Sequence, residues 1–165
     1  MKKMIQGIQY FIFFMALIFI DQFSKSWVVS NIQLSSHIDI IPNFLYLTFV
    51  KNTGAGFSLF ENYGILFFSV LTISACTIIV YTFFQTEKKL AKWILVMILA
   101  GAIGNFIDRL MLGYVRDFIG VYIFDWAFPI FNGADIFITG GFMALIGLTI
   151  IEEMSEKQAW KNKQL

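Results

Sequence analysis

The chain has 165 residues, of which 58% are hydrophobic and only 14% are charged, and its mean hydropathy is +0.74. A composition this apolar predicts a membrane protein, and the length predicts a single domain covering residues 1–165. The 12 basic and 11 acidic residues nearly cancel, so no basic surface favours nucleic acid as a partner.

Four apolar stretches are long enough to cross a bilayer, because a hydrocarbon core about 30 Å thick takes about 20 residues of helix. These stretches cover residues 8–28, 64–84, 93–112 and 132–151. The first has a basic start like that of a secretory signal peptide, but it runs into Asp21 and Lys25 without a small-residue cleavage pattern, so we interpret it as a span. The sequence therefore predicts an all-α polytopic membrane protein.

The basic residues predict the direction of these spans, since lysine and arginine concentrate in cytoplasmic loops. Eight of the twelve fall near the two termini or in the connection around residues 85–92, and four fall on the opposite side. We therefore expect both termini in the cytoplasm. Two loops, at about residues 29–63 and 113–131, are expected outside.

The first outer loop is rich in β-branched and aromatic residues at 37–41 and 44–50, on either side of Pro42 and Asn43. This pattern is typical of two short strands joined by a turn. We expect a small extracytoplasmic β-like element between spans one and two, lying on the membrane surface.

Polar residues gather near the outer ends of the spans. An ionised carboxylate in apolar surroundings usually shifts its pKa, finds a partner or takes part in chemistry. Two carboxyl groups that meet can share one proton, which supplies an acid and a base at the same pH. The candidate residues at this level are Asp21, Lys25, Asn52, Gly54, Asn105, Asp108, Arg109, Asp117, Asn132 and Asp135.

Spacing places several of them on shared helix faces. Asp21 and Lys25 are four residues apart and can pair along the first span. Gly101, Gly104, Asn105 and Asp108 are related by three and four residues, so they share one face of the third span.

Each candidate also has a purely structural interpretation. Asp21 with Lys25 fits an interfacial ion pair, and Asp108 with Arg109 fits a structural pair. The small residues fit helix packing, Asn132 or Asp135 fits a helix N-cap, and Asp117 fits an ordinary loop residue. Their meeting at one depth favours a functional site. His37 and Cys76 have no partners for a metal site, so we expect no metal, and nothing in the sequence indicates an organic cofactor.

Five motifs, in order along the chain, resemble those of the lipoprotein signal peptidases (signal peptidase II), aspartyl enzymes of bacterial membranes. They are Asp21-Gln22-x-x-Lys25, Asn52-Thr53-Gly54-Ala55-Gly56-Phe57, Gly101-Ala102-Ile103-Gly104-Asn105-Phe106-Ile107-Asp108-Arg109, Val115-Arg116-Asp117-Phe118 and Phe128-Pro129-x-Phe131-Asn132-x-Ala134-Asp135. The chain departs from the family pattern at three positions. Arg116 and Gly133 stand where apolar residues are common, and Ile136 stands where a small residue is usual.

The resemblance implies that Asp117 and Asp135 are the catalytic pair and that the other candidate residues support the site. It also implies a β-like cradle from the first outer loop, a mobile segment over the site from the second, and a location in the bacterial cytoplasmic membrane with the site near its outer face. The implied partners are membrane lipid and diacylglyceryl-modified prolipoproteins, which are the substrates and are cleaved just before the modified cysteine. One chain carries every motif, so a monomer would suffice.

Two other classes also fit paired membrane carboxylates. A proton-coupled transporter would place them near the midplane, often between internal repeats, and neither feature is visible here. A non-catalytic subunit for lipoprotein export would tolerate Asp→Asn changes at 117 and 135.

Overall fold

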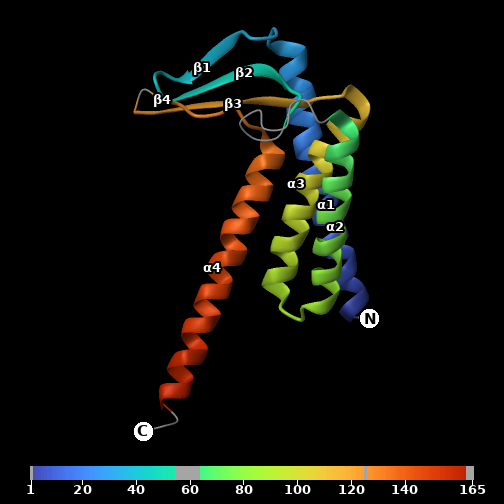
Figure 1. The fold of residues 1–165 in the computed structure, drawn as a ribbon, viewed down its shortest axis with the longest axis vertical. Coiled ribbons are helices and arrows are strands. Elements are labelled where there is room, and N and C mark those ends of the chain that lie inside the picture. Colours follow the sequence, from blue (N-terminus) through green and yellow to red (C-terminus); the bar gives the residue numbers. More distant parts are fainter. Residues whose placement is uncertain (1, 55–63, 125, 163–165) are drawn as a thin grey trace.

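Four helices form a bundle that carries a small sheet at one end (Figure 1). The computed structural model describes residues 2–54, 64–124 and 126–162. Within them, each helix is long and apolar enough to cross a membrane, as the four predicted spans require. The helices are α1 (Lys2–Asn31), α2 (Gly64–Gln85), α3 (Lys89–Leu112) and α4 (Gly133–Asn162). Both described ends of the chain lie at the end of the bundle opposite the sheet.

Three helices extend beyond the predicted spans into polar segments: α1 at both ends, α3 at its start and α4 at its end. α4 continues to Asn162, although its apolar stretch ends near residue 151. Hydropathy detects only the part of a helix that suits lipid, whereas Glu, Lys and Gln are also good helix formers. The 30 residues of α4 span about 45 Å, more than the hydrocarbon core requires.

The helix α3 lies at the centre of the bundle. Half of its most apolar window is buried inside the protein, against 6% to 11% for the other three helices. Its contact with α4 depends on a glycine, since a Cβ atom at Gly101 would lie 2.4 Å from the carbonyl oxygen of Ala134. Close approach is likewise required at Gly104, where a Cβ atom would lie 2.5 Å from Asp21 Oδ2. These glycines bring α1 and α4 against the central helix.

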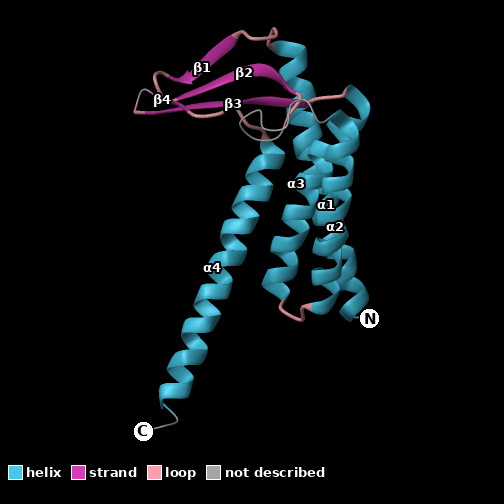
Figure 2. Cartoon of the chain, in the orientation of Figure 1, coloured by secondary structure: helices cyan, strands magenta, loops and turns pink. Residues whose placement is uncertain are grey.

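The sheet is antiparallel, in the order β1-β2-β3-β4, and its strands run across the helix axes (Figure 2). The predicted hairpin is confirmed as β1 (His37–Ile41) and β2 (Leu45–Asn52). The other two strands, β3 (Val115–Ile123) and β4 (Trp126–Ala127), come from the connection between α3 and α4. The sheet is therefore not confined to the loop between spans one and two, because β3 pairs with β2 along its length.

A β-bulge in β2 decides which residues share a face with Asp117. Leu47 pairs with Ile119 and Val50 with Asp117, so β2 contains one more residue than β3 over this interval. In an unbroken ladder Lys51 would share the face of Asp117, because side chains alternate across a strand. The bulge shifts the alternation by one residue and places Asn52 on that face instead.

The opposite face of β3 packs against the end of α1. Val28 and Ile32 of α1 form a buried cluster with Phe49 of β2 and Phe118 of β3. The sheet is thereby attached to the helix bundle by apolar burial on one face. The other face is left to line a pocket.

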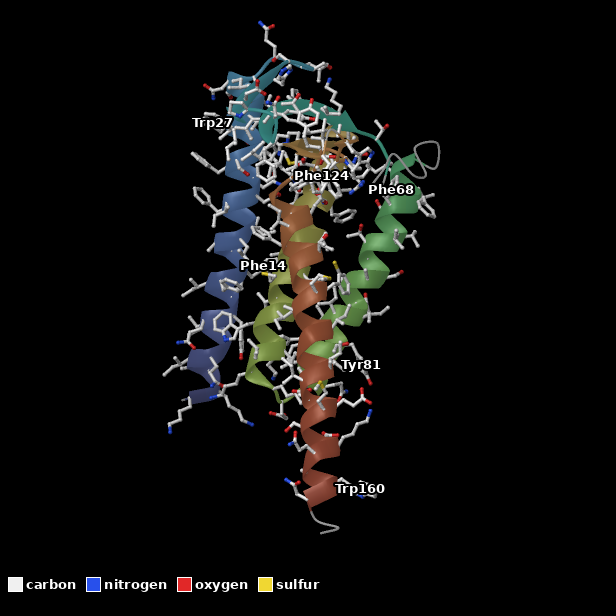
Figure 3. All side chains as sticks on the ribbon, turned by 90° about the vertical axis from the view of Figure 1, so that its left-hand side faces the viewer. Phe14, Trp27, Phe68, Tyr81, Phe124 and Trp160 are labelled. Atoms are coloured by element: carbon white, nitrogen blue, oxygen red, sulfur yellow. The ribbon has the colours of Figure 1, made fainter. Side chains whose placement is uncertain are left out.

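Aromatic side chains mark both ends of the bundle (Figure 3). Trp27 lies near the sheet, and Tyr81 lies toward the opposite end. Both are exposed, at 47% and 65%, as expected for rings at the two interfaces of a bilayer.

Candidate active site

A pocket of about 220 Å³ opens where β3, α3 and the start of α4 meet. Asp117 and Asp135 both line it, although 17 residues separate them in the sequence and they belong to different elements. The remaining lining residues are Asn52, Asn105, Arg109, Val115, Phe128, Pro129, Ile130, Phe131 and Thr139. Two carboxyl groups thus stand in a small pocket with a largely apolar wall.

Asp117 is buried, with 2% of its surface exposed. Its Oδ2 accepts a hydrogen bond of 2.8 Å from Asn52 Nδ2, and its Oδ1 accepts one of 2.6 Å from Asn132 Nδ2. Burial, and then the nearby charge of Asp135, raise the pKa of Asp117 to about 6, while the two amide donors oppose this rise. The side chain therefore holds its proton more tightly than an ordinary aspartate.

Asp135 lies in the first turn of α4, where it forms a reciprocal cap with Asn132. The backbone N–H of Asp135 donates to Asn132 Oδ1 at 3.1 Å, and the backbone N–H of Asn132 donates to Asp135 Oδ2 at 3.0 Å. Asn105 Nδ2 donates to the other carboxylate oxygen at 2.8 Å. The N-cap interpretation is therefore correct for Asn132, with Asp135 as its reciprocal partner inside the helix, and the cap also orients the carboxylate toward the pocket.

Three asparagine amides have their orientation set by partners that can only donate. Gly54 N–H donates to Asn52 Oδ1, and Asp135 N–H donates to Asn132 Oδ1. Lys25 Nζ donates to Asn105 Oδ1 at 2.9 Å. Each amide must then turn its NH₂ group toward an aspartate oxygen. Together with the backbone N–H of Asn132, these amides donate to all four carboxylate oxygens of Asp117 and Asp135.

A buried ion cluster lies behind these amides. Lys25 Nζ is 2.9 Å from Asp21 Oδ2 and 3.5 Å from Asp108 Oδ2, and all three side chains are fully buried. Asp21 also accepts a hydrogen bond of 3.0 Å from the backbone N–H of Ala134, which joins α1 to the start of α4. The predicted pairing of Asp21 with Lys25 is confirmed, but at a buried position in the bundle and not at an exposed interface.

The predicted pairing of Asp108 with Arg109 is wrong, because a different cation pairs with Asp108. Asp108 pairs with Arg116, whose Nη2 lies 2.6 Å from Asp108 Oδ1. Arg109 instead lines the pocket, and its Nη2 donates to the carbonyl oxygen of Gly54 at 2.7 Å. Its guanidinium carbon lies 4.5 Å from the centre of the Phe68 ring. Adjacent side chains of a helix point in different directions. Asp108 therefore faces Arg116, while Arg109 faces the pocket.

The ten candidate residues from the sequence all lie in this network. Sequence reasoning missed Arg116 and Gln22, which belong to matched motifs but were given no role. Gln22 Nε2 donates to Asp21 Oδ2 at 2.9 Å and to the carbonyl oxygen of Gly104 at 3.1 Å. The only signal in the sequence was Arg116 itself, a charged residue beside Asp117 where the family commonly has an apolar one. Residues 55–57 of the second motif lie outside the described residues.

Within the described residues, no three His, Cys, Asp or Glu side chains form a group that could hold a metal ion. The polar groups that face the pocket include amides, a guanidinium and two carboxyl groups. Such a set can bind a peptide backbone and exchange protons with it.

Comparisons with known proteins agree on one family. The pattern of the signal peptidase (SPase) II family matches residues 13–151. The chain is 40% identical to the lipoprotein signal peptidase of Enterococcus faecalis (strain ATCC 700802 / V583) over 152 residues, which cover 90% of this chain and 92% of the relative.

Two solved structures, each described as a bacterial membrane enzyme determined by the in meso method, have the same fold. The one at 2.3 Å resolution is 31% identical with a TM-score of 0.82, and the alignment covers 90% of this chain and 91% of the other. The one at 1.9 Å resolution is 31% identical with a TM-score of 0.77, covering 86% and 92%.

Proposed function

The chain belongs to the signal peptidase II family, and from this premise we propose that it is a membrane aspartic endopeptidase that removes signal peptides from lipid-modified prolipoproteins. Cleavage would fall just before the diacylglyceryl-modified cysteine. The observation that carries the mechanism is the shared pocket of Asp117 and Asp135, in which both carboxyl groups are held by fixed amide donors.

In this mechanism the two aspartates share one proton. The ionised partner takes a proton from water as the water attacks the scissile carbonyl. The protonated partner polarises the carbonyl oxygen and then protonates the leaving amine. Because the pair titrates as a unit, the proton belongs to the dyad and not to one residue.

The charge of the surrounding network supports a single shared proton. The network holds four carboxyl groups, those of Asp21, Asp108, Asp117 and Asp135. It holds three cations, Lys25, Arg109 and Arg116. With all four carboxyl groups ionised the network carries one excess negative charge, and one proton on the dyad makes it neutral. A buried cluster favours neutrality, because uncompensated charge is costly in a low-dielectric environment.

The supporting residues have distinct proposed roles. Asn52, Asn105 and Asn132 orient the two aspartates by hydrogen bonds. Lys25 holds Asn105 in the required orientation, and Arg109 anchors the segment after β2 through Gly54.

The pocket is lined by residues of β2, β3, the last turns of α3 and the start of α4. These parts of the chain lie at the sheet end of the bundle (Figure 1). We place this end at the outer face of the membrane and both termini in the cytoplasm, as the distribution of basic residues favours. A site at that depth suits a substrate tethered to lipid on one side and to an exported domain on the other. The sheet would then form an extracytoplasmic cradle over the site, and a monomer would be sufficient.

The proposal is tested by incubating the purified protein in detergent with a diacylglyceryl-modified prolipoprotein and with the same precursor lacking the lipid. Mass spectrometry locates the cleavage site. Cleavage of the lipidated precursor alone, immediately before the modified cysteine, is expected.

A wild-type protein that leaves the lipidated precursor intact would contradict the proposed substrate. Asp117→Asn or Asp135→Asn variants that keep full activity would contradict the two-aspartate mechanism while leaving the substrate proposal standing.

A further inference from the structure

Arg116 immediately precedes Asp117 on β3, but the two side chains point to opposite faces of the sheet. Asp117 lines the pocket, whereas Arg116 points toward the ends of α1 and α3. Its side chain is only 13% exposed, although it carries a permanent charge. Arg116 is thus a largely buried cation on the face of β3 opposite Asp117, and its partners indicate its role.

Arg116 joins three elements through its hydrogen bonds. Its Nε and Nη2 donate to the two oxygens of Asp108 on α3, at 3.1 and 2.6 Å. On α1, its Nη2 donates to Gln22 Oε1 at 2.9 Å and its Nη1 donates to Ser26 Oγ at 3.2 Å. The forked pairing with a carboxylate is the strong, directional form of this interaction.

The backbone of Arg116 is fixed by the same carboxylate. Its N–H donates to Asp108 Oδ2 at 3.0 Å, so Asp108 accepts three hydrogen bonds from this one residue. The other partners of Asp108 lie farther away, with Gln22 Nε2 at 3.3 Å and Lys25 Nζ at 3.5 Å. Arg116 is therefore the principal partner of a fully buried carboxylate, and the attachment is made one residue before Asp117.

We propose that Arg116 is a positioning residue for the peptidase reaction: by anchoring the start of β3 to Asp108 and to α1, it holds Asp117 in register with Asp135 across the pocket. The inference rests on the proposed catalytic role of Asp117. Arg116 does not line the pocket, so its effect is on the orientation of the catalytic carboxyl group and not on substrate contact. Misplacement of a reacting group by about 1 Å can cost on the order of 100-fold in rate.

The test compares Arg116→Gln with Arg116→Lys and with a matched control, Lys51→Gln. Lys51 pairs with Arg116 across the β2–β3 ladder, so its replacement removes the same charge from the same part of the sheet. However, Lys51 is exposed and lies over the ring of Tyr114, outside the Asp108 cluster. For each protein, kcat and KM are measured on the lipidated precursor, normalised to the folded fraction, and hydrogen exchange is followed peptide by peptide.

For Arg116→Gln, kcat is expected to fall on the order of 10- to 100-fold, with KM within about twofold of wild type. Exchange should rise in the segment around residues 115–118 and stay unchanged in the four helices. Arg116→Lys should recover part of the loss, since it keeps the charge but not the forked geometry. Lys51→Gln should stay within about twofold in both constants.

An Arg116→Gln variant with wild-type kcat would overturn the inference. A loss of activity accompanied by faster exchange throughout the helices would also overturn it, because it would indicate a general structural role. An inactive wild-type protein would instead count against the proposed function, and this result would be seen before any variant is compared.

Discussion

Replacing Asp117 with asparagine is expected to abolish peptidase activity, with an effect on stability that changes with pH. The loss in kcat should be on the order of 10²- to 10⁴-fold, because an amide can neither accept nor share the proton. The effect on stability has two opposing contributions, and both follow from the hydrogen bonds and the burial of this side chain.

The first contribution destabilises the variant. Both oxygens of Asp117 accept from amides whose orientation is fixed, Asn52 by Gly54 N–H and Asn132 by Asp135 N–H. An asparagine at position 117 must turn its NH₂ group toward one of these donors, whichever way its amide is rotated. One buried donor then loses its acceptor, which costs about 1–3 kcal/mol.

The second contribution stabilises the variant and depends on pH. The pKa of Asp117 rises from 3.8 to about 6 on folding, chiefly because of burial. The folded protein therefore gains from protonation below pH 3.8 and loses that gain as the pH rises through about 6, by on the order of 3 kcal/mol. Asparagine does not titrate, so the variant escapes this loss. It should be less stable than wild type near pH 4 and of similar or greater stability near pH 8.

Unfolding of both proteins in detergent at several pH values measures this difference. The stability of the variant relative to wild type should increase as the pH rises through about 6. Parallel stability curves would refute the argument, because they would show that folding does not shift this pKa. In the double variant Asn52→Asp, Asp117→Asn the accepting and donating groups are exchanged, so the hydrogen bond is restored. This variant should recover stability while remaining inactive, since the carboxylate no longer stands at position 117.

Three further predictions follow from individual contacts. Asp135→Asn should lower kcat on the order of 10²- to 10⁴-fold in the same cleavage assay, since an amide cannot share the proton of the dyad and leaves either Asn105 Nδ2 or Asn132 N–H without an acceptor. Retained activity would remove Asp135 from the dyad. Gly104→Ala should destabilise the protein by about 1–3 kcal/mol in thermal unfolding, because its Cβ would lie 2.5 Å from Asp21 Oδ2, whereas Gly7→Ala, with no atom within 4 Å, should not destabilise it. Lys25→Met leaves the buried Asp21 and Asp108 without their shared cation and should lower the free energy of unfolding by about 3–5 kcal/mol. Lys157→Met, at an exposed pair, should lower it by at most about 1 kcal/mol. Equal effects on the unfolding midpoint would contradict the burial argument.

The helical part of the fold could be predicted from the sequence because the signal for a span is local. Each apolar run is long enough to cross a bilayer by itself, and a helix satisfies its own backbone hydrogen bonds within the run. The first hairpin was also readable, since its β-branched residues flank Pro42 and Asn43 within one short segment. Nine of the ten candidate site residues could be named for a similar reason, as charged and amide side chains stand out in apolar surroundings, whereas Gly54 was named from its motif. Their roles remain proposals.

The tertiary structure alone decided how these residues combine. The sequence does not indicate that β3 completes the sheet of the first hairpin, or that a bulge in β2 places Asn52 and not Lys51 beside Asp117. Nor does it indicate that Asp108 pairs with Arg116, while the neighbouring Arg109 faces the pocket. Spans and helix faces depend on spacings of a few residues, which the sequence displays directly. Strand register and ion-pair partners depend on contacts between distant segments, and these exist only once the four helices and the sheet have packed together.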